Sequence, residues 1–337
     1  MRVLDQALRH WWQRQALPPP GPRSPLLVAF SGGLDSTALL HLAHRAWPGA
    51  VEAMHINHGL QAAASVFEAH CRGVCGQCGV PLLVQRVQVP LGPGDSLEEQ
   101  ARHARYRALA AVAQQRGASA VWLAQHADDQ AETVLLALSR GAGVNGLAAM
   151  GERVVHQGVV FGRPWLGVRQ SELRACVAQA GWPWVDDPSN AHTRFTRNRI
   201  RHDVMPALLQ AFPAMAQTLA RSARHCAQAS ELLAELAQQD LAQVGAPPRM
   251  AALRSLSDAR LANVLRHWLG QVAGRAPSTV QLDELVKQLR AASTRGHRIH
   301  LKVASGHVLR VGAMLEYVAP GEETACEAGG LRTRPLA

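Results

Sequence analysis

Residues 26–40 read LLVAFSGGLDSTALL, an apolar run that ends in Ser-Gly-Gly and passes directly into a helix-like pattern. Two adjacent glycines, Gly32 and Gly33, let backbone N–H groups converge on an anion. The helix that follows adds the partial positive charge of its N-terminus. The stretch therefore predicts a strand, a phosphate cradle and a helix in succession. It lacks the G-x-x-x-x-G-K-[ST] pattern of a Walker A loop, so no lysine reaches towards a γ-phosphate.

Strand and helix patterns alternate along the first half of the chain, with short connections between them. The expected strands are residues 26–30, 51–57, 82–87 and 120–125, and the expected helices are residues 35–45, 65–79, 97–116 and 128–138. Such alternation predicts a doubly wound α/β fold, with a parallel sheet covered on both faces. Ligands of these sheets bind at the carboxyl ends of the strands. A short amphipathic helix is expected ahead of the first strand, over residues 1–16.

The amino-acid composition changes from about residue 205 onward. Residues 208–243 are rich in alanine, leucine and glutamine and contain no glycine, which predicts one long helix or a helical pair. A small α+β module follows, with helical patterns at 259–268 and 279–292 and strand patterns at 298–303 and 307–311. The expected domains are an α/β domain at 1–210, a helical linker at 211–248, a small α+β domain at 249–320 and a tail at 321–337.

Composition points to a globular protein with a polyanionic partner. Of the 337 residues 47% are hydrophobic and 18% charged, which suits buried cores rather than disorder. The net charge is +10, and basic residues cluster at 194–201, so nucleic acid fits best; a solvated basic surface is the alternative. The N-terminus carries charges where a signal peptide needs an apolar core, and no stretch is long enough to cross a membrane. A cytoplasmic protein is expected.

Three of the six cysteines fall together, and their spacing has two interpretations. Cys71, Cys75 and Cys78 match the C-x3-C-x2-C pattern of radical S-adenosylmethionine enzymes, which hold an iron–sulfur cluster. However, positions i, i+4 and i+7 share one face of the helix expected at 65–79, where cysteine behaves as a small hydrophobe. Gln77 also stands where an aromatic residue usually precedes the last cysteine. The buried helix face is the favoured interpretation.

Several further segments, taken together with the cradle, resemble one family. The segment Ser31–Ser36 is similar to the pyrophosphate loop of ATP pyrophosphatases, which split ATP between its α- and β-phosphates. The other segments are residues 55–60 (HINHGL), 98–106 (EEQARHARY), 126–133 (HADDQAET), 163–166 (RPWL), 187–190 (DPSN) and 197–201 (RNRIR). Over roughly residues 25–210 they resemble the tRNA(Ile)-lysidine synthetase (TilS) family. Residues 253–318 are similar to its small substrate-binding domain. Gln61 and Gln125 depart from the family pattern, which has arginine and a second histidine there.

The resemblance implies a ligase that forms a carbon–nitrogen bond on RNA. ATP, with Mg2+, would adenylate the C2 oxygen of the wobble cytidine in the anticodon loop of isoleucine tRNA. The amine of L-lysine would then displace AMP and give lysidine. Because the free ε-amine has a pKa of about 10.4, the site must desolvate it or supply a base. The resemblance leaves a homodimer open.

Chemistry then assigns roles to the polar residues around the cradle. Asp35 is expected to bind Mg2+, and Asp129 to contact substrate or metal. His126 would neutralise charge on the phosphate or act as an acid–base group. Glu132 would hold the incoming amine or cap its helix, and Asp128 would be a second metal ligand or a helix N-cap.

We also expect two binding surfaces, one for ATP and one for tRNA. ATP is expected on Ser31, Gly32, Gly33, Leu34, Asp35, Ser36, His55 and Asn57. The spacing of His55 and His58 also matches a zinc pair, but no further ligand pair is visible. tRNA is expected on Arg102, Arg105, Arg194, Arg197, Asn198, Arg199 and Arg201, with Asn198 facing inward among the last four. A solvated helical face is the alternative for the run from Arg102 to Arg107.

Two other functions are compatible with the sequence. One is a tRNA thiolase that uses the same loop, with Cys75 and Cys78 handling sulfur or a cluster. The other is a non-catalytic tRNA-binding protein with a decayed ATP site. The intact Ser31–Ser36 loop and the Asp128-Asp129 pair argue against the second.

Overall fold

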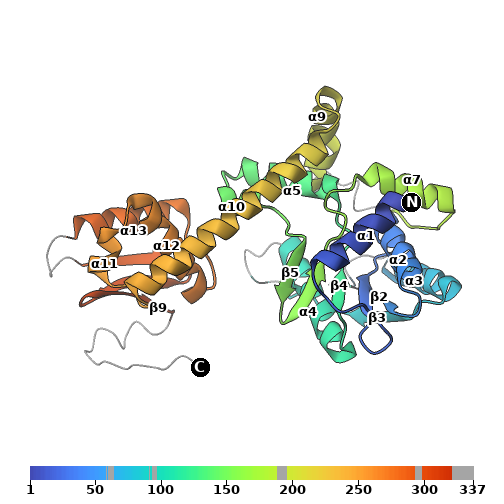
Figure 1. The fold of residues 1–337 in the computed structure, drawn as a ribbon, viewed down its shortest axis with the longest axis horizontal. Helices are drawn as coiled ribbons and strands as arrows, with labels where there is room; N and C mark the ends of the chain where they lie inside the picture. Colours follow the sequence, from blue (N-terminus) through green and yellow to red (C-terminus); the bar gives the residue numbers. More distant parts are fainter. Residues whose placement is uncertain are drawn as a thin grey trace. The chain divides into compact units, whose positions relative to one another are not determined.

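The computed structural model describes residues 1–57, 59, 64–90, 92, 97–187, 196–292 and 298–320 (Figure 1). The chain forms two compact units, Met1–Ala227 and Gln228–Ala337. The dividing point falls inside helix α10 (Met215–Val244). Within the described ranges, no helix is both long and apolar enough to span a lipid bilayer.

A six-stranded sheet forms the centre of the first unit, in the order β3-β2-β1-β4-β6-β5. Its strands are β1 (Leu26–Ala29), β2 (Val51–Asn57), β3 (Leu82–Arg86), β4 (Ala120–Trp122), β5 (Arg153–His156) and β6 (Val159–Gly162). All neighbouring pairs are parallel except β5 with β6. This confirms the doubly wound α/β fold. Since β1 lies between β2 and β4, the Ser-Gly-Gly turn leaves the sheet at its topological switch point.

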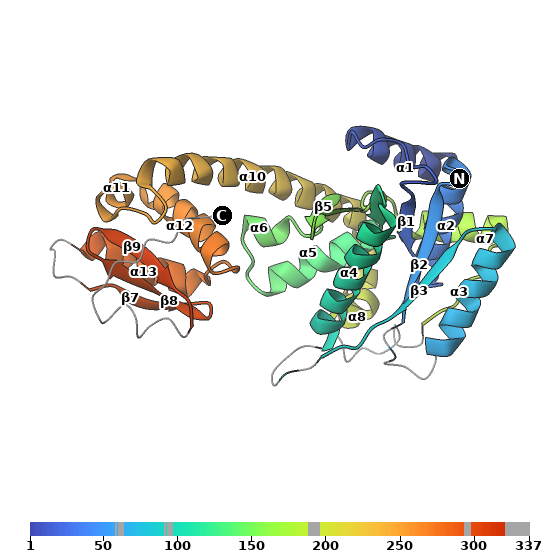
Figure 2. The ribbon, with the colours of Figure 1, turned by 90° about the horizontal axis from the view of Figure 1, so that it is seen from below.

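Successive residues of β1 point into two different cores, so both faces of the sheet are covered. Leu26 and Val28 pack with α1 (Arg2–Arg14), α2 (Leu34–Ala46), α3 (Ala64–Cys78) and α7 (Gln170–Ala180). Leu27 packs on the other face with α4 (Leu97–Arg116). Figure 2 shows α4 on the opposite side of the strands from α2 and α3. The two-residue period of the strand thus fixes the two layers.

The N-terminal helix is docked by tryptophans, and the helix expected at residues 1–16 is confirmed. Trp11 and Trp12 meet Trp47 and Trp122 with ring centroids 5.4–6.1 Å apart. A Cβ at Gly162 would lie 2.4 Å from the Trp11 ring, so only glycine permits this contact. Three of the four rings are buried and Trp47 is partly buried, and their packing anchors α1 against the sheet.

A separate small core within the first unit packs the segment from residue 196 onward against α5. It contains Ala131 of α5 (Ala127–Ser139), Ile200, Met205 and Ala216. The segment consists of α8 (Thr196–Arg199), a π-helical turn η2 (Ile200–Val204), α9 (Met205–Ala211) and the start of α10. This packing holds the arginines of α8 and η2 beside α5. The short helix α6 (Val144–Leu147) follows α5.

The second unit has its own core and an antiparallel sheet in the order β7-β8-β9. Its elements are α11 (Met250–Ser255), α12 (Asp258–Val272), α13 (Thr279–Ala291), β7 (His300–Val303), β8 (Gly306–Val311) and β9 (Met314–Val318). Ser257 and Ser278 accept backbone N–H groups at the starts of α12 and α13. The fully buried Asp240 of α10 is neutralised by Arg260.

Some elements were not expected from the sequence. The β5–β6 hairpin, α7 and β9 carry no strong periodic signal and were missed. The expected strand at 120–125 ends at Trp122. The stretch at 208–243 is a helical pair rather than one helix, because α9 ends before Pro213 and α10 starts after it.

Candidate active site

Hydrogen bonds to Ser36 stabilise the Ser-Gly-Gly turn. The Ser31 amide donates to Ser36 Oγ at 3.2 Å, and the Ser36 hydroxyl lies 3.0 Å from both Ser31 Oγ and the Gly33 carbonyl. Gly33 is the N-cap of α2, and no side chain caps the helix. The first N–H groups of a helix lack partners within the helix. They are therefore available to an anion at this turn, as the sequence predicted for a phosphate.

Gly32 must be glycine for two reasons. Its φ of +85° lies in the left-handed region, which disfavours side chains. A Cβ there would also lie 3.1 Å from Cys71 Sγ and from His70 Cδ2. The loop is thus packed against α3.

Two residues expected to bind ATP lie at the carboxyl end of β2, in different surroundings. His55 is buried, and its Nδ1 lies 3.0 Å from the Phe30 carbonyl, so this carbonyl orients the ring next to the loop. Asn57 instead donates to Glu68 at 3.1 Å and accepts the Gly59 amide at 2.9 Å. Asn57 therefore shapes the turn after β2. His58, the other half of the histidine pair, lies outside the described residues.

His126 brings three carboxylates together at the carboxyl end of β4. Its Nε2 lies 3.5 Å from Asp35 and 3.4 Å from Asp129, and its Nδ1 lies 3.7 Å from Asp128. His126 is 1% exposed and is the N-cap of α5, in a capping box with Asp129. The loop after β1 and the start of α5 thus meet beyond the carboxyl ends of two neighbouring parallel strands.

The charge on His126 is set by these neighbours. Burial lowers the pKa of His126, whereas the negative charges of Asp129, Asp35 and Asp128 raise it, and the net pKa lies above the ordinary histidine value. His126 Nδ1 accepts the Asp129 N–H in the cap; when this nitrogen instead takes up a proton, the imidazole is cationic and can neutralise charge on a phosphate oxygen beside the cradle.

Gln170, which was not among the predicted site residues, links Asp35 to Asp128. The side-chain amide of Gln170 lies 3.3–3.4 Å from both Asp35 carboxylate oxygens, and its backbone N–H donates to Asp128 at 2.8 Å. Arg169 also pairs with Asp128, at 3.3 Å. One expectation was that Asp128 caps α5, and this is wrong, because His126 is the N-cap. Asp128 instead accepts the first N–H of α7.

Glu132 is not a helix cap but the centre of an ion-pair network. It is 2% exposed and accepts Arg197 Nε at 2.9 Å and Arg201 Nε at 2.6 Å. Both arginines also reach Asp129 Oδ1, at 3.3 and 3.1 Å. Asn198 was the residue of this segment that we expected to face inward. Arg197 and Arg201, which were not expected to do so, contact the carboxylates of α5. They lie four residues apart, on one helical face towards α5.

The other residues expected to bind tRNA are distributed more widely. Arg102 lies over the Tyr106 ring at 5.5 Å, Arg199 is exposed on α8, and Asn198 is half-buried. Arg194 lies outside the described residues, as do Gln61 and residues 188–190 of the DPSN segment. Which of these residues contact tRNA stays a prediction.

The cysteines form part of the core. Cys71 and Cys75 are buried, Cys78 packs partly against the same core, and none forms a disulfide. Burial raises the pKa of Cys71 and of Cys75 to about 12. Among the described residues, no group of three or more His, Cys, Asp or Glu is arranged to hold a metal ion. The buried-face interpretation of this helix is confirmed.

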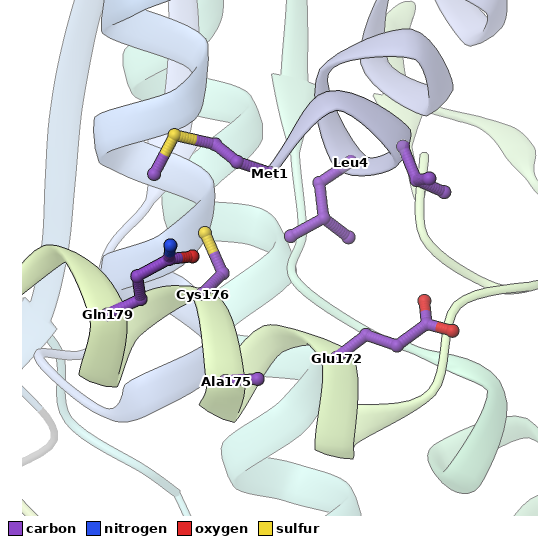
Figure 3. A pocket seen from close by; sticks show the side chains of 7 residues that line it. Met1, Leu4, Glu172, Ala175, Cys176 and Gln179 are labelled. Carbon is purple, nitrogen blue, oxygen red and sulfur yellow. The ribbon is translucent and has the colours of Figure 1, made fainter.

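A shallow pocket lies elsewhere, between α1 and α7 (Figure 3). It is lined by Met1, Val3, Leu4, Glu172, Ala175, Cys176 and Gln179. None of these residues belongs to the acidic group around His126. The chemistry is therefore assigned to the strand ends rather than to this pocket.

Comparison with known proteins agrees with this geometry. Residues 9–208 match the PP-loop domain, and residues 249–311 match the TilS substrate binding domain. The fold and the loop thus define a PP-loop protein. A U34-tRNA thiolase from Methanococcus maripaludis, solved with its [4Fe-4S] cluster, superposes with a TM-score of 0.57 over 66% of this chain and 78% of that chain. At 15% identity this likeness shows the fold alone.

The sequence relatives are more specific. The tRNA(Ile)-lysidine synthase of Polaromonas naphthalenivorans is 55% identical over 87% of this chain and 89% of its own length. That of Bordetella pertussis is 43% identical over 85% and 92%, and that of Burkholderia pseudomallei is 47% identical over 80% and 56%. The chain therefore belongs to the tRNA(Ile)-lysidine synthase family. It spans little more than half of the Burkholderia relative.

Proposed function

We propose that this protein is a ligase that converts the wobble cytidine of isoleucine tRNA to lysidine, with ATP and L-lysine as co-substrates. The observation that carries the proposal is the meeting of His126 with Asp35 and Asp129 beside the Ser31–Ser36 loop. It occurs in a chain that is 55% identical to a lysidine synthase over 89% of that protein.

In the first step the C2 oxygen of cytidine attacks the α-phosphorus of ATP, and pyrophosphate leaves. The Gly32-Gly33 turn and the N-terminus of α2 hold the departing phosphates. The imidazolium of His126 offsets negative charge on the α-phosphate. The C2 oxygen, a poor leaving group by itself, is now part of an AMP ester.

Magnesium fits the residues present. Asp35 is a carboxylate at the cradle whose side chain is 28% exposed, and its contacts with Gln170 are long. Mg2+ keeps several waters and takes one or two carboxylates together with substrate phosphates, so a complete protein cage is not required. Asp35 would hold the ion, with Asp128 as the second carboxylate. The bound ion would neutralise charge on the phosphates.

In the second step the ε-amine of lysine attacks C2, the bond from C2 to the AMP oxygen breaks, and AMP leaves. The amine must first lose a proton. We assign this proton to the Asp129 carboxylate, which faces His126 at the same strand end. Glu132, held by Arg197 and Arg201, is the second carboxylate that we place near the amine.

The second unit would bind tRNA through basic side chains, but two of its arginines form ion pairs within the unit. Arg260 and Arg290 pair with Asp240 and Asp258, so they hold the fold of this unit. Arg298 and Lys302 are exposed along β7 and its approach and can meet phosphates. A cytoplasmic location and a homodimer stay predictions.

Pyrophosphate release tests the first step. We expect release that requires ATP, Mg2+ and isoleucine tRNA, and that proceeds in the absence of lysine or sulfide. Release that ignores tRNA would contradict the proposal. A protein that purifies with iron and transfers sulfur to the tRNA would support the thiolase alternative instead.

A further inference from the structure

One aromatic side chain lies exposed at the turn between α9 and α10. Phe212 is 59% exposed, and it is the only exposed Phe, Trp or Tyr in the part of the chain that the structure describes. Aromatic rings carry a large apolar surface whose removal from water is favourable. An exposed ring therefore presents a flat apolar face to a binding partner.

The backbone on either side of this ring is held by hydrogen bonds. The Phe212 N–H donates to the Leu208 carbonyl at 2.8 Å, and the Phe212 carbonyl accepts the Met215 N–H at 2.9 Å. Pro213 follows directly, and its ring fixes its own φ. Because the side chain of phenylalanine has only two χ angles, little conformational entropy is lost when the ring is fixed against a ligand.

A guanidinium connects this turn to the active site. Arg169 Nη1 donates to the Pro213 carbonyl at 3.2 Å, and Nε of the same side chain lies 3.3 Å from Asp128. Asp128 in turn lies 3.7 Å from His126. A single side chain thus spans the distance between the Phe212-Pro213 turn and the carboxylates around His126, so the turn borders the active site.

The segment that carries the ring is basic. Residues 211–227 contain Arg221, Arg224 and His225 but no carboxylate, and both arginines are exposed. An aromatic ring with guanidiniums nearby suits single-stranded RNA, whose bases stack on aromatic side chains while its phosphates meet arginines. A protein partner is a poorer fit, because a stable interface buries about 800 Å² on each side, far more than one ring supplies.

We propose that Phe212 stacks on a base of the anticodon loop that neighbours the wobble cytidine. When the cytidine leaves the base stack to reach the active site, the neighbouring base loses a stacking partner. The Phe212 ring replaces that partner and so stabilises the RNA conformation in which the cytidine is extruded. This inference rests on the proposed function and adds an aromatic contact to the basic residues expected to bind tRNA.

The test measures binding of the anticodon stem-loop of isoleucine tRNA to the full chain, without lysine and with α,β-methylene-ATP, which cannot be cleaved between its α- and β-phosphates. Phe212→Ala should raise the Kd by about 5- to 100-fold, the usual worth of one stacked base. Phe212→Trp should bind as tightly as wild type, whereas Phe212→Leu, which is apolar but not aromatic, should bind as weakly as Phe212→Ala. The slope of log Kd against log salt should not change, because no phosphate contact is lost. Val3→Ala, which shortens another exposed apolar side chain of the first unit, is the control.

Stacking is also measured directly, with 2-aminopurine in place of either base that flanks the wobble cytidine. At one of these positions the fluorescence should be lower in the wild-type complex than in the Phe212→Ala complex. Wild-type affinity in Phe212→Ala, in a protein that still unfolds cooperatively, overturns the inference and leaves the proposed function intact. Full affinity in Phe212→Leu also overturns it, because an apolar contact without stacking would then suffice. Loss of stem-loop affinity with the ring supports the inference even if the wild-type chain forms no lysidine, a result that would refute the proposed function alone.

Discussion

Arg201 forks onto Glu132, with its Nε 2.6 Å from one carboxylate oxygen and its Nη2 2.9 Å from the other. Arg197 reaches the same buried carboxylate from one turn earlier. Two arginines expected to bind RNA thus hold an acidic group at the active site. The segment after residue 196 therefore completes the site rather than only flanking it.

Glu132→Gln should weaken both the fold and the lysine step. A neutral amide leaves two partly buried guanidiniums with Asp129 as their remaining carboxylate, so the free energy of unfolding should fall by about 1–3 kcal/mol. Urea unfolding measures the first effect, and lysine consumption measures the second, while pyrophosphate release should persist. Glu172→Gln, exposed on α7, is the control. Wild-type stability and lysine use would show that the network on Glu132 is dispensable.

Asp35→Asn should abolish pyrophosphate release with the fold intact. The amide keeps the shape of the side chain but loses the charged oxygen that Mg2+ requires. Release should be measured at saturating magnesium, beside Asp283→Asn, which changes an exposed carboxylate in the second unit. Near wild-type rates in Asp35→Asn would remove this residue from the catalytic set.

The buried thiols should be unreactive in the native protein. With pKa values of about 12, Cys71 and Cys75 stay protonated below about pH 9, and the reactive thiolate forms only as the pH rises towards 12. At pH 8, mass spectrometry should find slow alkylation of both by iodoacetamide in native protein and fast alkylation in urea. Activity should survive Cys71→Ala, Cys75→Ala and Cys78→Ala together. Loss of activity in a triple variant that unfolds cooperatively would revive the thiolase interpretation.

Removal of exposed charges on β7 should reduce the salt dependence of tRNA binding. Each of Arg298→Gln and Lys302→Gln should lower the log–log slope by about 0.7–0.9 if it removes one phosphate contact. Arg290→Gln, which breaks a pair with Asp258, should instead lower stability. Filter binding across a salt series distinguishes these effects. An unchanged slope in the Arg298 and Lys302 variants would exclude β7 from the tRNA surface.

Local chemistry predicted most of the first unit. The Ser-Gly-Gly turn, the alternating elements and the acidic start of α5 are set by nearby residues, so they were visible in the sequence. Partners that come from distant segments were not. Gln170, which joins Asp35 to Asp128, follows no motif in its own surroundings. Whether Arg197 faces a carboxylate or a phosphate depends on packing against α5, which no local pattern encodes. The same holds for Arg260, whose partner is the buried Asp240.

The central claim is tested most directly by the fate of labelled lysine. The full chain should be incubated with ATP, Mg2+, unmodified isoleucine tRNA and L-lysine carrying 15N at its ε-amine, and the tRNA then digested to nucleosides. Mass spectrometry should find cytidine at the wobble position converted to lysidine with the 15N label retained, and Asp35→Asn should give unmodified cytidine. A labelled reaction that leaves the wobble cytidine unchanged, or that replaces its C2 oxygen with sulfur, would contradict the account.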